Sequence, residues 1–234
     1  RALPALCVER RAVIATFTLG ERLDTRCVEA LHEGISRAVE IRARVLVVTG
    51  EPGQFCLGMR FEPVPDRASL VGFATVMRAL LLAPLPTLAV VDGPALGGGL
   101  GVAAACDYVL ASEHARFGLP EALYGLAPAI IRPALLRRLS PQRLAMLIAT
   151  IHSRSASEAL AVGLVDEVAT DLAAAQSRVV RSLRRASSET IVAVRRWDAA
   201  TLEVALAAGV DETAAALERL EVRAAITSEE PAWL

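Results

Sequence analysis

The sequence predicts an α/β protein built around a parallel sheet. Two short, continuous apolar runs, 45–48 and 87–91, have the length and composition of strands that are buried on both faces. Segments with apolar residues at helical spacing lie beside these runs, so strand and helix alternate along the chain. Such alternation favours parallel strand pairing with right-handed crossover connections.

Two strands and a helix are expected before the first of these runs. Residues 5–9 and 12–19 have the pattern of a hairpin that turns at 10–11. Asp24 is placed to cap a helix that runs to about Glu40, because a carboxylate at that position accepts from the first unpaired N–H groups of a helix.

The rest of the chain is expected to be mostly helical. Helices are predicted at 69–83, at 128–139, from Ser140–Pro141 onward, from the capping box Ser155–Glu158 onward and over 171–223, with short strands at 107–111 and 163–168. The predicted organisation is a core over 1–168, which carries the ligand site, and a C-terminal helical region over 169–234. That region is expected to pack on the main layer or on another subunit.

Composition excludes several classes of function. The chain has 234 residues, 54% of them hydrophobic, and a net charge of −1, so no basic field for nucleic acid or for a membrane surface is expected. It has no lysine, which excludes a Schiff-base or lysine-base mechanism. The apolar run 79–91 is interrupted by prolines and is too short to span a bilayer.

Cysteine and histidine form no recognisable metal or disulfide pattern. The four cysteines lie far apart without a C-x-x-C pair, and the three histidines lack metal-ligand spacing. We therefore expect a reducing, cytoplasmic location and neither a metal nor a redox cofactor.

A glycine cluster, Gly97–Gly101, follows the strand at 87–91 and precedes a helix of small residues. Three interpretations compete. The first is tight helix–strand packing, and the second is a dinucleotide loop, because 99–104 fits G-x-G-x-x-A although the strand ends too early. The third is an oxyanion hole, because glycines let backbone N–H groups at a helix start approach a ligand closely.

Taken together, these segments resemble the crotonase (enoyl-CoA hydratase/isomerase) superfamily. The resemblance covers nearly the whole chain, and its motifs are specific in their order and spacing: Val47–Gly50, Phe55–Met59, Asp92–Gly99, Cys106–Tyr108, Phe117–Glu121 and Ala159–Val165. It implies a crotonase-like spiral of ββα turns with a C-terminal helical region that forms trimers or hexamers.

The resemblance also implies the catalytic groups. An enolate of a thioester would lie between two backbone N–H groups, which by position are those of Met59 and Gly98. Hydratases of the family use two glutamates; Glu121 matches one of them, and Gly101 stands at the position of the other. The missing acid argues against simple water addition. The alternative role for Glu121 is a loop salt bridge with Arg116.

Within the superfamily the chain is most similar to the dehydrating enzyme of polyketide β-branching cassettes. That similarity implies a 3-hydroxy-3-methylglutaryl-type acyl group on an acyl carrier protein or CoA, with no cofactor beyond the pantetheine arm of the substrate. A partner decarboxylase would use the product. Glu121 would remove the C2 proton and return it to the leaving hydroxyl on the same face.

The candidate substrate-binding residues are Arg60, Gly97, Tyr124 and His152. Arg60 and His152 are candidate cations for the extra carboxylate of the substrate, and Tyr124, one helical turn beyond Glu121, is a hydrogen-bond donor or a packing residue. The arginines Arg137, Arg138 and Arg143 would either meet an acidic carrier protein or form an exposed helical face.

Two rival functions stay open. The first is another enzyme that acts on enoyl-CoA, either a double-bond isomerase or a hydratase. An isomerase needs one glutamate to move a proton between C2 and C4. A non-catalytic or RNA-binding protein on this fold is the other rival, against which the net charge and the intact glycine cluster argue.

Overall fold

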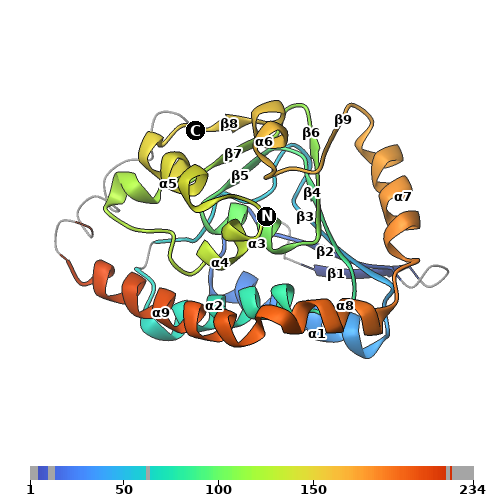
Figure 1. Ribbon diagram of the computed structural model, residues 1–234, viewed down its shortest axis with the longest axis horizontal. Coiled ribbons are helices and arrows are strands. Elements are labelled where there is room, and N and C mark those ends of the chain that lie inside the picture. Colours follow the sequence, from blue (N-terminus) through green and yellow to red (C-terminus); the bar gives the residue numbers. More distant parts are fainter. Residues whose placement is uncertain (1–4, 10–13, 62–63, 220–221, 223–234) are drawn as a thin grey trace.

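The computed structural model describes residues 5–9, 14–61, 64–219 and 222, which fold into two sheets surrounded by helices (Figure 1). The larger sheet has the strand order β1-β2-β3-β4-β6-β9. Its strands are β1 (Ala5–Glu9), β2 (Ile14–Thr18), β3 (Val45–Thr49), β4 (Thr87–Val91), β6 (Tyr108–Ser112) and β9 (Glu167–Ala169).

Strand pairing in the larger sheet follows the predicted pattern. β1 and β2 pair antiparallel, and every later pair from β2 to β9 is parallel. All five residues of β4 are buried, as its continuous apolar sequence predicts. The predicted turn at 10–11 lies outside the described residues.

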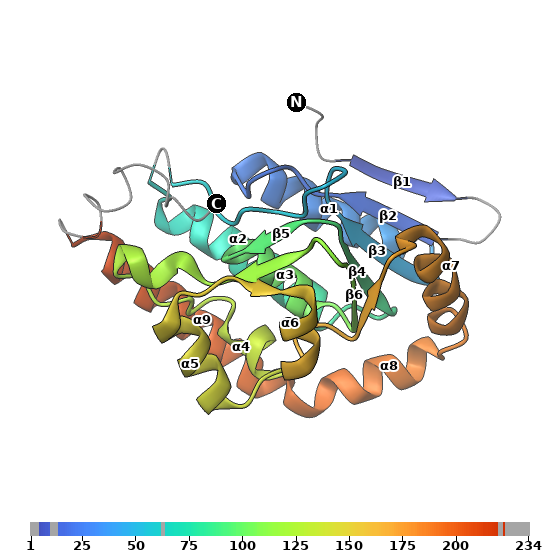
Figure 2. The same ribbon diagram turned by 90° about the horizontal axis from the view of Figure 1, so that it is seen from above.

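Helices cover both faces of this sheet. The helices are α1 (Thr25–Glu40), α2 (Arg67–Leu81), α3 (Gly98–Ala105), α4 (Arg132–Leu136), α5 (Pro141–Thr150), α6 (Ala156–Val162), α7 (Leu172–Leu183), α8 (Ser188–Arg195) and α9 (Ala199–Leu217), with 3-10 turns η1 (Pro120–Tyr124) and η2 (Arg196–Asp198). The main core lies between the sheet and helices α1 to α3, and a smaller core lies under α7 on the opposite face (Figure 2).

Capping side chains fix where the first two helices begin. The Asp24 carboxylate accepts from the Cys27 N–H at 2.8 Å and starts α1 at the predicted place. Asp66 accepts from the Ser69 N–H at 2.8 Å, so α2 begins two residues before the predicted start. The N-cap of α2 is therefore Asp66.

The structure has a second, three-stranded sheet that the sequence did not predict. It consists of β5 (Pro94–Leu96), β7 (Arg116–Gly118) and β8 (Arg154–Ser155) in the order β5-β7-β8. β5 leads directly into α3, and β7 leads into η1. The Gly97 N–H donates to the Gly118 carbonyl at 2.9 Å, so the start of α3 and the start of η1 are held next to each other.

The helix predicted over 128–139 forms only over Arg132–Leu136, as α4, and residues 128–131 and 137–139 are not helical. Residues 128–131, which precede α4, form a non-helical segment, here called the strap, that packs between α3 and α9. A Cβ on Gly209 of α9 would lie 2.8 Å from the Ala129 carbonyl oxygen, and one on Gly101 of α3 would lie 2.2 Å from Cγ2 of Ile131. Pro133 stops the helix from extending back through 128–131, because it has no N–H to donate to the carbonyl of residue 129, and close packing on both sides holds these residues in place.

The C-terminal helices pack on the core of the same chain. Helix α9 runs along α2 (Figure 1), and α8 inserts the buried Arg195 beneath it. The Arg195 guanidinium donates to the carbonyls of Leu80, Ala83 and Leu85 and pairs with Asp107. This confirms the first of the two expected packing modes, on the main layer.

Candidate functional site

The turn at Gly58–Met59 approaches the start of α3 very closely. Gly58 has φ +90°, and a Cβ on it would lie 2.9 Å from the Leu96 carbonyl oxygen and 3.3 Å from the Gly98 nitrogen. A Cβ on Gly98 would in turn lie 3.4 Å from Cγ of Met59. A side chain at position 58 would separate the two segments, so glycine is required there.

This approach brings together the two residues predicted to supply N–H donors. Met59 forms a parallel bridge with Leu23, in which Leu23 donates to the Gly58 carbonyl and accepts from the Arg60 N–H. Neither hydrogen bond of this bridge uses the Met59 N–H. Among the described residues neither the Met59 N–H nor the Gly98 N–H donates to another backbone group. Both donors are thus left for a ligand.

Gly98 is also the first residue of α3, whose N-cap is Gly97 with φ +50°. The first N–H groups of a helix have no partner within it, and the helix dipole adds partial positive charge there. The arrangement therefore suits an oxygen that carries negative charge.

Glu121 faces the same place from the other side. A Cβ on Gly97 would lie 2.8 Å from its Oε1 atom, so a side chain at 97 would push this carboxylate aside. Its Oε2 atom is buried and has no hydrogen-bond partner in the described part of the chain. Burial raises the pKa of Glu121 from 4.5 to about 7, and a hydrogen bond from its own backbone N–H acts in the opposite direction.

The alternative role of Glu121 in a salt bridge with Arg116 finds no support. Arg116 is exposed, whereas the Glu121 Oε2 atom is buried and has no hydrogen-bond partner among the described residues. Glu121 also lies in the first turn of η1 rather than in a loop. Tyr124 follows three residues later in the same 3-10 turn, which places both side chains on one side of it. Tyr124 is half-buried and packs against the main core.

The two candidate cations lie in separate hollows. Arg60 lines a hollow of about 240 Å³ that Met59 also borders, together with Asp24 and Asp66. His152 lines a hollow of about 400 Å³ beside β5 and β7, with Arg116 among its neighbours. Arg60 therefore shares a hollow with Met59, and His152 does not.

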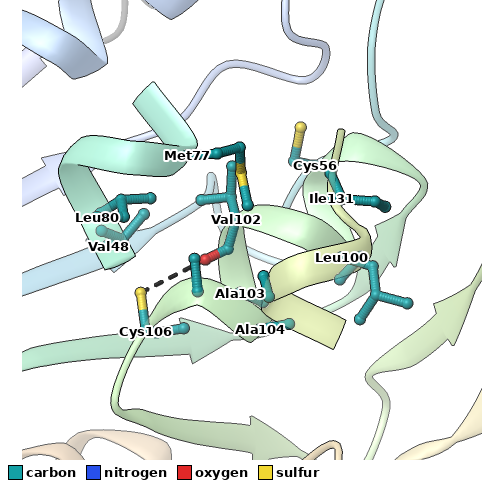
Figure 3. Packing of buried hydrophobic residues seen from close by; sticks show 14 of the residues in the cluster. Val48, Cys56, Met77, Leu80, Leu100, Val102, Ala103, Ala104, Cys106 and Ile131 are labelled. Carbon is teal, nitrogen blue, oxygen red and sulfur yellow. Dashed lines mark hydrogen bonds between the residues drawn. The ribbon is translucent and has the colours of Figure 1, made fainter. Parts of the chain in front are cut away.

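The space next to Gly101 is filled by a residue that the sequence analysis did not single out. Ile131 is buried, and its Cγ2 lies 2.2 Å from the position of a Cβ on Gly101. Figure 3 shows Ile131 beside α3. No sequence signal marks Ile131, because its role depends on the strap being non-helical.

One of the three arginines proposed to meet a carrier protein is unavailable. The Arg138 side chain is only 9% exposed, and it donates to the carbonyls of Ala104 and Cys106 and pairs with Asp166 at 2.9 Å. Arg137 and Arg143 are exposed. Arg138 is thus a structural residue that joins α3 to the segment before β9.

The described residues contain no group of three or more histidine, cysteine, aspartate or glutamate side chains that could hold a metal ion. No helix among them has both the length and the apolar character needed to cross a membrane.

Comparison with known proteins identifies the family. The model of the enoyl-CoA hydratase/isomerase family matches residues 9–227. Over 209 residues the chain is 34% identical to mevalonyl-coenzyme A hydratase of Aspergillus fumigatus, covering 81% of this chain and 77% of that protein. Over 160 residues it is 29% identical to the bacillaene synthase dehydratase of Bacillus subtilis, covering 65% of this chain and 60% of that one.

A solved enoyl-CoA hydratase from Mycobacterium avium superposes on the model with a TM-score of 0.86 at 29% identity, over 100% of both chains. The chain belongs to the enoyl-CoA hydratase/isomerase family. The predicted crotonase fold, and an enzyme of the enoyl-CoA hydratase type, are thereby confirmed at the level of the family.

Proposed function

We propose that this protein eliminates water from a 3-hydroxy-3-methylacyl thioester, with Glu121 as the base. The observation that carries this proposal is a buried carboxylate, unpartnered at Oε2 among the described residues, that faces the N-cap of α3. Next to it lie the N–H groups of Met59 and Gly98, which supply an oxyanion hole. The proposed thioester is carried by an acyl carrier protein or by CoA.

In this mechanism the thioester carbonyl accepts from Met59 and Gly98, which acidifies the proton on C2. Glu121 takes that proton, and the enolate forms with its charge on the carbonyl oxygen. Each donor of this kind is typically worth about 3–4 kcal/mol of barrier. Expulsion of the C3 hydroxyl then restores the carbonyl, and the same carboxylate returns the proton to the leaving oxygen. One acid thus serves both steps as a syn elimination.

A pKa near 7 suits this double duty. A base must be ionised to accept the proton and must release it readily to the leaving group, which a carboxylate at its ordinary pKa does less well. The absence of a side chain at Gly101 agrees with a mechanism that uses a single acid.

The acyl group is inferred from two relatives. The Aspergillus relative is named for mevalonyl-CoA and the Bacillus relative for bacillaene synthesis. Mevalonyl and 3-hydroxy-3-methylglutaryl groups share the 3-hydroxy-3-methyl centre and differ at the far end, alcohol against carboxylate. Arg60, in the hollow beside Met59, is the proposed partner of that carboxylate. A carrier protein, a partner decarboxylase and a trimeric or hexameric assembly remain proposals from the family resemblance.

Double-bond isomerisation is the second candidate, because a single carboxylate is also what a shift between C2 and C4 requires. The filled space next to Gly101 supports both candidates equally. The pocket distinguishes them, since an isomerase needs an apolar channel for the acyl tail where a dehydratase of this branch needs a cation.

The test is mass spectrometry of 3-hydroxy-3-methylglutaryl and mevalonyl thioesters, each on a carrier protein and on CoA, with wild type and Glu121→Gln. Loss of one water with wild type and not with the variant is the expected result. Arg60→Gln should slow the glutaryl substrate and spare the mevalonyl one. No water loss from any substrate, with turnover of a 3-enoyl thioester, would replace dehydration by isomerisation.

A further inference from the structure

Glu121 lies against the N-cap of α3, and Ile131 lies against its first turn. The Gly101 N–H donates to the Gly97 carbonyl at 3.0 Å, so these two residues are one helical turn apart. Residues four apart at a helix start lie about 6 Å apart along the axis. The missing Cβ of Gly97 faces Glu121, and the missing Cβ of Gly101 faces Ile131.

Ile131 can reach this place only because of its two glycine neighbours. Gly101 has no side chain to hold it off α3, and Gly209 lets α9 press on the strap from behind, with a Cβ there 3.0 Å from the Ile130 Cα. The side chain is 2% exposed. It therefore fills the volume that a side chain at 101 would otherwise occupy.

We propose that Ile131 is a positioning residue for Glu121: seated over Gly101, it keeps that flank of the carboxylate free of water and of a second acid. Two glycines and one isoleucine would then set the site to single-acid chemistry. This inference rests on the proposed role of Glu121 as the base, although the state of the carboxylate can be measured without any substrate.

The electrostatics agree with this assignment. Loss of water on burial is the main cause of the raised pKa of Glu121, and no neighbouring charge in the described part of the chain contributes to it. A group whose ionisation is governed by hydration should respond when an apolar wall beside it is removed.

The experiment is an infrared titration of the Glu121 carboxyl band, identified by subtraction of Glu121→Gln, in wild type, Ile131→Ala and Ile130→Ala. Ile130 is the matched control, since it is the same residue, adjacent and also buried, at 4% exposure. We expect the midpoint of about 7 to fall by at least one pH unit in Ile131→Ala and to stay in place in Ile130→Ala. Ile131→Val, a smaller deletion, should shift it in the same direction by less and covers the case in which the alanine variant does not fold.

An unchanged midpoint in both Ile131 variants, or an equal fall in Ile130→Ala, would overturn the inference. The dehydration assay runs on the same proteins. A wild type that titrates as expected and acts on no thioester would remove the proposed function and leave the role of Ile131 in setting hydration intact. Water loss by wild type with no shift in the variants would do the reverse.

Discussion

The buried carboxylate of Glu121 should make the stability of the protein fall as pH rises. Its pKa is 4.5 in the unfolded chain and about 7 in the folded one, a difference of about 2.5 pH units. A group whose folded pKa is raised stabilises the fold fully below its unfolded pKa and loses that contribution as pH rises through its folded pKa. At about 1.4 kcal/mol per unit, the loss is about 3 kcal/mol between about pH 4.5 and 7.

Glu121→Gln isolates this contribution, because glutamine has similar shape and no charge. The assay is urea denaturation of wild type and variant at fixed protein concentration from pH 4.5 to 8.5. The free energy of unfolding of wild type minus that of the variant should fall by about 3 kcal/mol up to about pH 7 and then level off. The same fall should occur in 1 M salt, since salt screens charges and does not alter burial.

The activity of the enzyme should change in the opposite direction over the same pH range. A base acts when it is ionised, so kcat/KM is expected to rise as pH passes 7 while the stability contribution disappears. A stability difference that is constant between pH 5 and 8 would show that Glu121 is well hydrated in the folded protein and would refute the reasoning. So would a difference that grows with pH.

Two further predictions concern packing. Gly101→Ala should destabilise the protein by about 1–3 kcal/mol, because the new Cβ would lie 2.2 Å from the buried Ile131 side chain. Gly72→Ala is the control: its Cβ would have its nearest neighbour at 3.7 Å, so this variant should be neutral or stabilise by up to about 1 kcal/mol. Equal effects in urea denaturation would contradict the packing described. Arg195→Ala should lower the free energy of unfolding by about 3–5 kcal/mol, because it leaves Asp107 and the carbonyls that Arg195 binds without this partner. The exposed Arg196→Ala should lower it by less than about 0.5 kcal/mol. An equally small effect of both variants would contradict the role of the Arg195 network.

Local signals in the sequence predicted much of the main sheet. β4 was assigned with its observed bounds from a five-residue apolar run, and Asp24 fixed the start of α1 through its side-chain cap. Both features depend on residues close together in the chain. Parallel pairing of β3 and β4 followed from the alternation of strands and helices.

The second sheet and the strap were not predictable in the same way. Strands of two or three residues such as β8 carry no alternation signal, and they form only because β5 and β7 meet after long excursions of the chain. Pro133 marks the break before α4, but the contacts of the strap with Gly101 and Gly209 join residues far apart in the chain. Close contacts between distant glycines and their neighbours are invisible in a single sequence.

Some features of the candidate site were likewise predictable from the sequence, and others depend on the folded structure. Glu121, Met59 and Gly98 came from motif positions, and the structure brings them around one place. The raised pKa of Glu121 and the contact of Ile131 with Gly101 depend on burial and packing. His152, chosen only for its charge type, lies in the hollow that Met59 does not border.

The measurement that tests the central claim most directly is exchange of the C2 protons of 3-methylglutaryl thioester in deuterium oxide. This acyl group lacks the hydroxyl, so the enolate can form but cannot eliminate water. Wild type is expected to exchange these protons at a rate that rises with pH through about 7, and Glu121→Gln should be slower by at least about 100-fold. Exchange that survives in Glu121→Gln, or that shows no rise near pH 7, would contradict the assignment of Glu121 as the base.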